Sequence, residues 1–238
     1  MSIVRICLWS GPRNISTALM YSFAQRSDTQ VFDEPLYAHY LNNCLEEERE
    51  KHPSYQEVLN SLENDGENVI KMMMGPFESE VVFFKNMTHH LKGVNRDFLD
   101  SVVNVILTRN PEDMLPSFSK VIKNPSLKDV GYADHVELLE LFREKGIKHV
   151  IVESREVLNN PEKQLKRICA AACIPFESAM LKWQRGARKE DGVWARHWYS
   201  GTHKSTGFEA YVKKPDPFPE NLKPLLNKCL PLYNQLIK

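Results

Sequence analysis

Long apolar runs are missing from this chain of 238 residues. The longest, such as residues 102–107, fall far short of the roughly 18 residues that a membrane-spanning helix needs. The N-terminal run 1–9 carries Arg5 and leads straight into a turn, which is not the order of regions in a signal peptide. We therefore expect no transmembrane helix, no membrane partner and a cytoplasmic location.

An excess of either charge is also missing, because 31 Lys and Arg balance 31 Asp and Glu. That balance does not favour binding to nucleic acid, so we expect no nucleic-acid partner. The charge is uneven along the chain. Residues 43–65 hold seven acidic and two basic side chains, whereas residues 180–214 hold eight basic and three acidic ones. The second stretch is where an anionic ligand would be attracted.

Cysteines are few and scattered, at five in the whole chain. Cys169 and Cys173 alone lie close together, at a spacing that would place them on one face of a helix. Neither a disulfide framework nor a zinc pattern emerges, so we expect buried thiols and no metal.

The composition, with 42% apolar and 26% charged residues, is that of an ordinary folded protein. Apolar runs typical of strands alternate with amphipathic patterns typical of helices, which predicts an α/β protein with three layers around a central parallel sheet. We treat residues 1–238 as one domain. Strands are expected within 3–9, 31–32, 69–74, 81–84, 102–108 and 150–152. Helices are expected within 15–23, 37–62, 135–145, 161–173 and 221–237, and another starting at Pro111.

The loop Ser10–Thr17 follows the first strand and precedes a helix. Free backbone N–H groups and the positive end of the helix dipole make this position an anion site. The Gly-Lys-Ser/Thr ending of an ATP-binding Walker A loop is absent, which disfavours a magnesium-dependent kinase. Taken alone, the pattern would also suit an ordinary helix start with a Ser cap.

A second strand-to-helix junction runs through Arg109 to Pro111, and Ser117 lies two turns into the helix. Arg109 comes at the carboxyl end of its strand, where open α/β sheets bind ligands, and a guanidinium matches phosphate oxygens well. Two such junctions suit a ligand phosphorylated at two places. The alternative is that Arg109 only pairs with Asp113.

These two junctions resemble the nucleotide site of sulfotransferases. The Arg13-x-x-Ser16-Thr17 loop is similar to the 5′-phosphosulfate loop of that family, and Arg109 with Ser117 is similar to its 3′-phosphate site. A third element is similar to the family's strand, its "Asp/Glu-x-Leu, Pro-Glu" helix and its "Gly-Ile-Pro" ending. It runs from 150–153 through 160–162 to 174–176, so the likeness spans residues 3 to about 176.

More narrowly, the chain resembles a little-characterised sulfotransferase-like branch whose members are also labelled aminotransferase-like. The second label finds no chemical support, because no Lys stands in a recognisable pyridoxal phosphate context. Ile15 occupies a place often held by Gly, and Arg13 a place often held by Lys. The stretches that carry this resemblance are 9–17, 33–40, 85–90 and 191–199.

The resemblance implies a P-loop nucleotide-hydrolase-like (sulfotransferase) fold. It also implies an enzyme that moves a sulfuryl group from 3′-phosphoadenosine 5′-phosphosulfate (PAPS) to a hydroxyl or amine of a small soluble acceptor. The product would be 3′-phosphoadenosine 5′-phosphate (PAP), and no metal would be needed. The residues expected to bind the nucleotide are Arg13, Asn14, Ile15, Ser16, Thr17, Arg109, Ser117, Lys204, Ser205 and Thr206.

Sulfuryl transfer asks for cations over the leaving oxygen, a base for the acceptor proton and a dry pocket. Lys85 and Arg13 are candidates for the cations, although Lys85 would alternatively be a solvated charge at a strand end. His89 and His90 are candidates for the base because imidazole titrates near neutrality. Glu34 is their rival, since some sulfotransferases use a carboxylate.

The acceptor side is expected from two other stretches. Residues 194–199 pack two Trp and two cations into six residues, which favours a lid over the nucleotide or acceptor within a loop at about 183–214. A structural aromatic cluster is the alternative for this lid, and capping of the helix after Pro35 is the alternative for Asp33 and Glu34. The candidate acceptor residues are Asp33, Tyr37, His39, Trp194, Arg196, His197 and Trp198.

Two other functions stay open at this stage. A P-loop phosphotransferase, such as a small-molecule kinase, would bind ATP with magnesium. A non-catalytic nucleotide-binding protein of the same fold would bind PAPS without turnover. The sequence also leaves open the identity of the acceptor, the choice among His89, His90 and Glu34, and whether the chain forms a homodimer.

Overall fold

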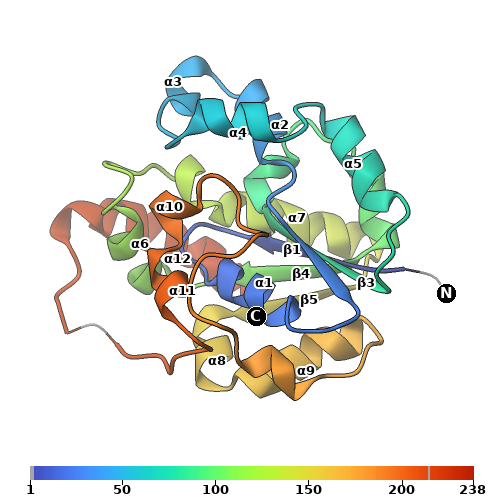
Figure 1. The fold of residues 1–238 in the computed structure, drawn as a ribbon. Coiled ribbons are helices and arrows are strands. Elements are labelled where there is room, and N and C mark those ends of the chain that lie inside the picture. The colour runs from blue at the N-terminus through green and yellow to red at the C-terminus, as the bar shows by residue number, and fades with distance from the viewer. Residues whose placement is uncertain (1–2, 214) are drawn as a thin grey trace.

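The computed structural model describes residues 3–213 and 215–238. Five parallel strands form one sheet in the order β2-β3-β1-β4-β5 (Figure 1). The predicted α/β class with a central parallel sheet is therefore confirmed. The strands are β1 (Val4–Ser10), β2 (Thr29–Asp33), β3 (Val81–Met87), β4 (Val103–Thr108) and β5 (His149–Glu153).

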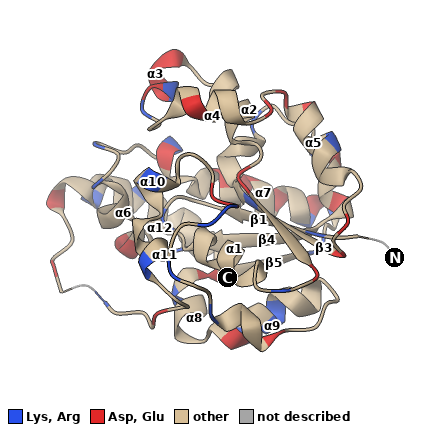
Figure 2. Ribbon diagram, viewed as in Figure 1, with Lys and Arg blue, Asp and Glu red and all other residues tan. Residues whose placement is uncertain are grey.

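Helices cover both faces of the sheet. The longer ones are α1 (Ser16–Phe23), α5 (Gly66–Met74), α6 (Pro111–Phe118), α7 (Tyr132–Lys145), α9 (Pro161–Ala171) and α12 (Lys223–Leu236). The shorter ones are α2 (Tyr37–Asn43), α3 (Glu46–Arg49), α4 (Tyr55–Ser61), α8 (Ser154–Asn159), α10 (Ala195–Trp198) and α11 (Ser200–Lys204). Figure 2 shows acidic and basic residues mixed over these outer helices, with α3 largely red.

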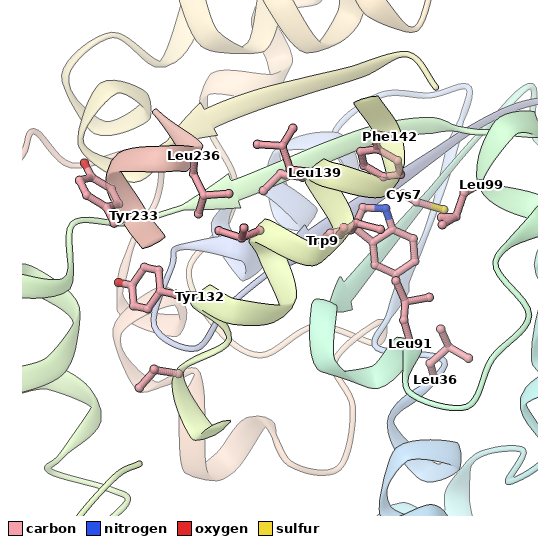
Figure 3. Packing of buried hydrophobic residues seen from close by; sticks show 14 of the residues in the cluster. Cys7, Trp9, Leu36, Leu91, Leu99, Tyr132, Leu139, Phe142, Tyr233 and Leu236 are labelled. Carbon is pink, nitrogen blue, oxygen red and sulfur yellow. The ribbon is translucent and has the colours of Figure 1, made fainter. Parts of the chain in front are cut away.

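The central strands are buried on both faces because their side chains alternate between two cores. Cys7 and Trp9 of β1 face one core with α5, α6, α7 and α12, part of which Figure 3 shows. Ile6 and Leu8 face the other core, which contains α1 and α9. Continuous apolar runs are typical of parallel strands buried in this way. The carboxyl ends of all five strands meet at one edge of the sheet, which positions the site.

One predicted strand is wrong. Residues 69–74, interpreted as a β-like run, lie within α5. The Asp65 side chain accepts a hydrogen bond of 2.9 Å from the backbone N–H of Asn68, which caps this helix. Val69 and Met73 are its buried apolar residues, four positions apart. That spacing is helical, but a six-residue apolar run also fits a buried strand, so the run alone does not distinguish the two structures.

Other elements differ in their limits. The helical stretch expected over 37–62 is divided into α2, α3 and α4, and Ser54 in the turn before α4 has a left-handed backbone with φ 63°. The long segment after residue 183 contains α10 and α11. Cys169 is buried in α9, whereas Cys173 lies beyond the end of that helix and is exposed, so the two thiols do not share a helix face.

No helix within the ranges 3–213 and 215–238 is both long and apolar enough to span a lipid bilayer. In the same ranges, no group of three or more His, Cys, Asp or Glu side chains is placed to hold a metal ion.

Helix α7 buries an imidazole beneath the loop that follows β1. His135 is 1% exposed, and burial lowers its pKa to about 4, from an ordinary value of 6.5. The unfolded chain therefore binds a proton more readily than the folded one as the pH falls from 6.5 toward 4. Stability contributed by the neutral imidazole is present above pH 6.5 and is lost in that interval.

We predict that lowering the pH from 7 to 5 reduces the free energy of unfolding by about 2 kcal/mol more in the wild type than in His135→Gln. Urea unfolding at the two pH values measures this difference. The matched control is His197→Gln, which changes an exposed imidazole. An identical pH dependence in the wild type and His135→Gln would contradict the prediction, whatever stability the substitution itself removes.

Candidate functional site

The loop between β1 and α1 is held in an unusual backbone shape. Arg13 and Ile15 both have left-handed conformations, with φ 59° and 61°. Such angles are rare for non-glycine residues and are a true outlier for a β-branched one. Asn14 between them is buried, and its side-chain amide donates a 2.9 Å hydrogen bond to the carbonyl of Leu107. The Ser154 hydroxyl donates to the Asn14 carbonyl at 3.0 Å, so neighbouring strand ends brace the loop.

Helix α1 begins directly after Ile15, and no side chain caps it. The Ser cap that was the alternative interpretation of this loop is therefore not formed. Ser16 and Thr17 occupy the first turn, are mostly buried, and line the main cavity. The backbone N–H groups of this first turn have no intrahelical partner, because an α-helix leaves its first N–H groups unbonded.

Two arginines meet beside this loop. The Arg109 guanidinium donates a 2.7 Å hydrogen bond to the carbonyl of Arg13, and the Arg13 side chain donates to the Ser117 hydroxyl at 3.1 Å. Burial lowers the pKa of both guanidinium groups, and the charge of Arg109 lowers that of Arg13 further. Among the described residues neither arginine forms an ion pair.

The alternative partner of Arg109 is occupied elsewhere. Asp113 pairs with Arg155 at 3.0 Å and accepts a 2.8 Å hydrogen bond from the Tyr211 hydroxyl. The geometry thus places Arg13, Arg109 and Ser117 together, as expected if the two strand-to-helix junctions form one site. It leaves two half-buried positive charges next to each other without a carboxylate.

A buried ionic cluster lies at the ends of β2 and β3. Asp33 and Lys85 are register partners in these parallel strands, and Glu34 follows Asp33 with a left-handed φ of 47°. The Lys85 ammonium donates to Asp33 at 2.8 Å and to Glu34 at 2.5 Å. The side chain of Lys85 is 2% exposed, so it is not the solvated charge that was the alternative. Neither carboxylate caps α2.

Tyr199 completes this cluster and was not among the predicted site residues. Its hydroxyl lies 2.5 Å from the Lys85 nitrogen, donates to Asp33 at 2.8 Å and accepts a 2.9 Å bond from the Trp194 indole N–H. The Gly192 N–H donates at 3.0 Å to Oδ2 of Asp33, the oxygen that also accepts the bond from Tyr199. The available signal was that Tyr199 ends the aromatic segment 194–199, but no spacing in the sequence connects it to Lys85.

The charges of the cluster shift its pKa values. Burial raises the pKa of Glu34 above its ordinary 4.5; the Lys85 charge opposes this rise, and the Asp33 charge adds to it. Burial lowers the pKa of Lys85, but the charges of Asp33 and Glu34 outweigh that effect and raise it overall. Lys85 is therefore ionised at neutral pH, and Glu34 is a carboxylate that takes up a proton more readily than usual.

His89 and His90 lie in a different environment. Burial lowers the pKa of His89 to about 3 and that of His90 well below 6.5. The His90 ring stacks between those of Tyr37 and Tyr40, with centroids 4.8 and 5.0 Å away. Both imidazoles are therefore uncharged at neutral pH and bind protons weakly.

One cavity of about 690 Å³ joins these groups. It lies at the carboxyl edge of the sheet, between the β1–α1 loop and the segment that holds α10 and α11, drawn in orange in Figure 1. The predicted site residues that line it are Arg13, Asn14, Ile15, Ser16, Thr17, Glu34, Tyr37, Lys85, His89, His90, Arg109, Trp194 and Trp198.

Other candidates lie outside that lining. Asp33 lies behind Lys85, and Ser117 reaches the cavity only through Arg13. Arg196 and His197 are exposed and contact Ser54 of the loop before α4. His39 is buried against the carbonyl of Lys92. Lys204 is the last residue of α11, and Ser205 and Thr206 follow it. Ser205 accepts a 3.2 Å bond from the Trp183 indole N–H, and the contact of these three residues with a 3′-phosphate stays a prediction.

The model of the family described as "Sulfotransferase domain" matches residues 4–238. The chain belongs to this family. Two curated proteins of Arabidopsis thaliana, named branched-chain-amino-acid aminotransferase-like proteins 2 and 1, are each 40% identical to it over 230 residues. The match covers 96% of this chain but 40% of each of them, so the chain spans about two fifths of their length. The predicted resemblance to an aminotransferase-like branch of sulfotransferases is confirmed.

Solved structures agree on the fold. The sulfotransferase domain from the olefin synthase of Synechococcus PCC 7002 has a TM-score of 0.54 at 17% identity, with 95% of this chain and 94% of that chain covered. The sulfotransferase domain from the curacin biosynthetic pathway has a TM-score of 0.54 at 14% identity, with 96% and 97% covered. The predicted sulfotransferase fold is thus confirmed, and family membership supports sulfotransferase activity in general terms.

The buried cluster generates a prediction about stability. Lys85→Met would leave Asp33 and Glu34 buried without a cation, which is expected to reduce the free energy of unfolding by about 3–5 kcal/mol. Adding Glu34→Gln removes one of the two uncompensated charges, so the double variant should recover part of that loss. Urea unfolding at neutral pH measures both changes.

The control for this series is Lys92→Met, because Lys92 is exposed and forms no ion pair within the described chain. It should change stability by no more than about 0.5 kcal/mol. A Lys85→Met variant as stable as this control would show that the cluster does not hold the strand ends together.

Proposed function

We propose that this chain transfers a sulfuryl group from PAPS to a hydroxyl or amine of a small acceptor. Two half-buried arginines without a carboxylate partner carry the proposal. Arg13 and Arg109 lie next to an uncapped helix start, and their mutual repulsion would be relieved by an anion between or beside them. A nucleotide phosphorylated at both 5′ and 3′ positions matches two adjacent anion sites.

The donor set of the site fits such a nucleotide. The N–H groups of the first turn of α1 and the hydroxyls of Ser16 and Thr17 would hold its 5′ end. Arg109 would hold its 3′-phosphate, and Ser117 would act there by positioning the Arg13 guanidinium, from which its hydroxyl accepts a bond. PAPS, when bound, supplies the sulfuryl group and the leaving PAP. Arg13 is the cation best placed for the leaving oxygen, because the three N–H groups of Lys85 are already used within the cluster.

Glu34 is the proposed general base. It lines the cavity, it is held by Lys85, and its raised pKa gives a carboxylate that accepts a proton more strongly than an ordinary one. The acceptor oxygen or nitrogen would lose its proton to Glu34 as its bond to sulfur forms and the bond from sulfur to the phosphate oxygen breaks. His89, with a pKa of about 3, is the weaker candidate.

The segment 194–202 would keep water from this reaction. Trp194, Trp198 and Tyr199 line the cavity, and the Arg13 guanidinium donates a 3.1 Å hydrogen bond to the carbonyl of Trp198. Reaction in a space closed by these rings strengthens the interactions of Arg13 with developing negative charge.

Recognition of the nucleotide at two sites is tested by Arg109→Ala. We expect this change to weaken the binding of PAP by about ten- to a hundredfold. The binding of adenosine 5′-phosphate should weaken far less, because only PAP carries the 3′-phosphate. Calorimetric titration measures both affinities. Equal weakening of the two ligands would remove Arg109 from the 3′-phosphate site, and binding of ATP with magnesium in place of PAP would favour a phosphotransferase.

The base is tested by Glu34→Gln. We expect turnover to fall by about 10²–10⁴-fold with PAP affinity unchanged. Because the pKa of Glu34 is raised above 4.5, the wild-type rate should rise with pH through a midpoint above that value, as the carboxylate loses its proton. His89→Gln and His90→Gln should keep this pH profile. A profile that changes in a histidine variant and survives in Glu34→Gln would transfer the role to that histidine.

A further inference from the structure

A wall of aromatic rings leads away from Glu34 along the cavity. The Trp194 and Tyr37 ring centroids are 5.1 Å apart, Tyr37 stacks on His90 at 4.8 Å, and His90 stacks on Tyr40 at 5.0 Å. The rings of His52 and His89 lie 5.6 and 4.7 Å from that of Tyr40. All six rings line the cavity. The proposed transfer uses only the Glu34 end of this wall.

The imidazoles in the wall carry no charge at neutral pH. Burial lowers the pKa of His52 to about 4 and that of His89 to about 3, and it lowers that of His90 well below 6.5. The faces of the Trp and Tyr rings in the wall attract cations through their quadrupoles, and the neutral imidazoles beside them do not repel a cation. His90 is also 1% exposed, and its Nδ1 atom has no hydrogen-bond partner among the residues that the structure describes, so the wall offers a buried polar atom to a ligand.

Half-buried carboxylates lie at the end of the wall that is farther from Glu34. Glu48, Asp129 and Asp134 line the cavity there, are half-buried, and form no ion pair in the part of the chain that the structure describes. Asp129 accepts hydrogen bonds from Ser126 through one carboxylate oxygen only. Figure 2 shows α3, which carries Glu48, largely red.

Cations near this end are either exposed or already paired. Lys51, Lys92 and Lys128 line the same cavity but are exposed, so water screens their charges. Arg96 pairs with Glu137 at 2.7 Å. Half-buried carboxylates are screened less than exposed ammonium groups, so negative charge dominates at the rings.

The excess of negative charge affects the pKa values of Tyr40 and His52. Burial raises the pKa of Tyr40, and among the charges that raise it further are those of Glu48, Asp129 and Asp134. Burial lowers the pKa of His52. The charges of Asp129 and Glu48 act in the opposite direction and raise it, and each has a larger effect than the charge of Lys51, which lowers it. An aromatic surface under a negative field is the environment that binds ammonium groups in proteins.

We propose that the acceptor is an alcohol that carries an ammonium group, which binds against Tyr40 among Glu48, Asp129 and Asp134. The inference rests on the proposed function for the reacting end, where the hydroxyl would lie at Glu34. Two stacking steps, of 4.8 and 5.0 Å, separate the Tyr37 ring beside Glu34 from the Tyr40 ring. The hydroxyl and the ammonium of the acceptor are therefore several bonds apart.

Three alcohols of one length test this inference. We would titrate the protein, saturated with PAP, with 6-aminohexan-1-ol, hexan-1-ol and 6-hydroxyhexanoate, and measure binding by calorimetry. The ammonium compound should bind about tenfold more tightly than the neutral alcohol, and the carboxylate most weakly. No turnover is needed for this readout.

Variants test whether the preference for the ammonium compound depends on the aromatic wall and on the carboxylates beside it. Tyr40→Leu removes the ring face and should abolish the preference for the ammonium compound, whereas Tyr40→Phe keeps the face and should retain it. Asp134→Asn should weaken the binding of the ammonium compound alone, by about two- to fivefold. The control is Glu140→Gln, also on α7, whose carboxylate is exposed, lies outside the lining of the cavity and forms no ion pair within the described residues.

Failure of this inference and failure of the proposed function give different results. Normal PAP binding with equal affinities for the three alcohols, with tighter binding of the carboxylate, or with no alcohol bound would overturn the ammonium site alone. If PAP does not bind, the alcohols are titrated without it. A preference for the ammonium compound that is lost in Tyr40→Leu would then support the site while contradicting the nucleotide assignment.

Discussion

One lysine held between two carboxylates inside the protein constrains the rest of the site. Burying three charged groups costs several kcal/mol for each, and only their mutual attraction and hydrogen bonds offset that cost. The parallel register places Asp33 beside Lys85, and the left-handed turn at Glu34 brings the second carboxylate back to the same ammonium. Lys85 and Asp33 are therefore positioned by the sheet, and Glu34 is positioned by the turn that directly follows β2.

The same cluster holds down a segment that comes more than a hundred positions later in the chain. Tyr199 and the Gly192 N–H both bond to Asp33, and Asp191 bonds to the Tyr21 hydroxyl at 2.6 Å and lies 2.9 Å from the His203 ring nitrogen. With the bond from Arg13 to the Trp198 carbonyl, these contacts anchor the residues between Trp183 and Phe208 over the cavity. The segment that covers the cavity is therefore held in place by the same charged residues that form the buried cluster.

Much of this was predictable from local sequence, and the rest depended on contacts between distant residues. The apolar runs of β1 and β4 and the Pro111 helix start are local signals, and they were interpreted correctly. The Arg13 loop lies between a strand and a helix as expected, and its contact with a phosphate stays a prediction. The helix at 66–74 was missed because a six-residue apolar run has two periods that fit it. The bond between Tyr199 and Lys85 could not be predicted, since it requires the strand order, the register and the path of the late segment together.

Ile15 shows what the loop between β1 and α1 requires of its residues. Its φ of 61° is an angle that glycine adopts without strain, yet here a β-branched side chain takes it and packs against the core beside α1. Conformation and not residue identity therefore defines this loop, and a search that demands glycine at this position would pass over chains that build the same turn by strain. Packing of the Ile15 side chain against the core stabilises this strained backbone, so a substitution that loosens the core beneath Ile15 would also change the shape of the loop.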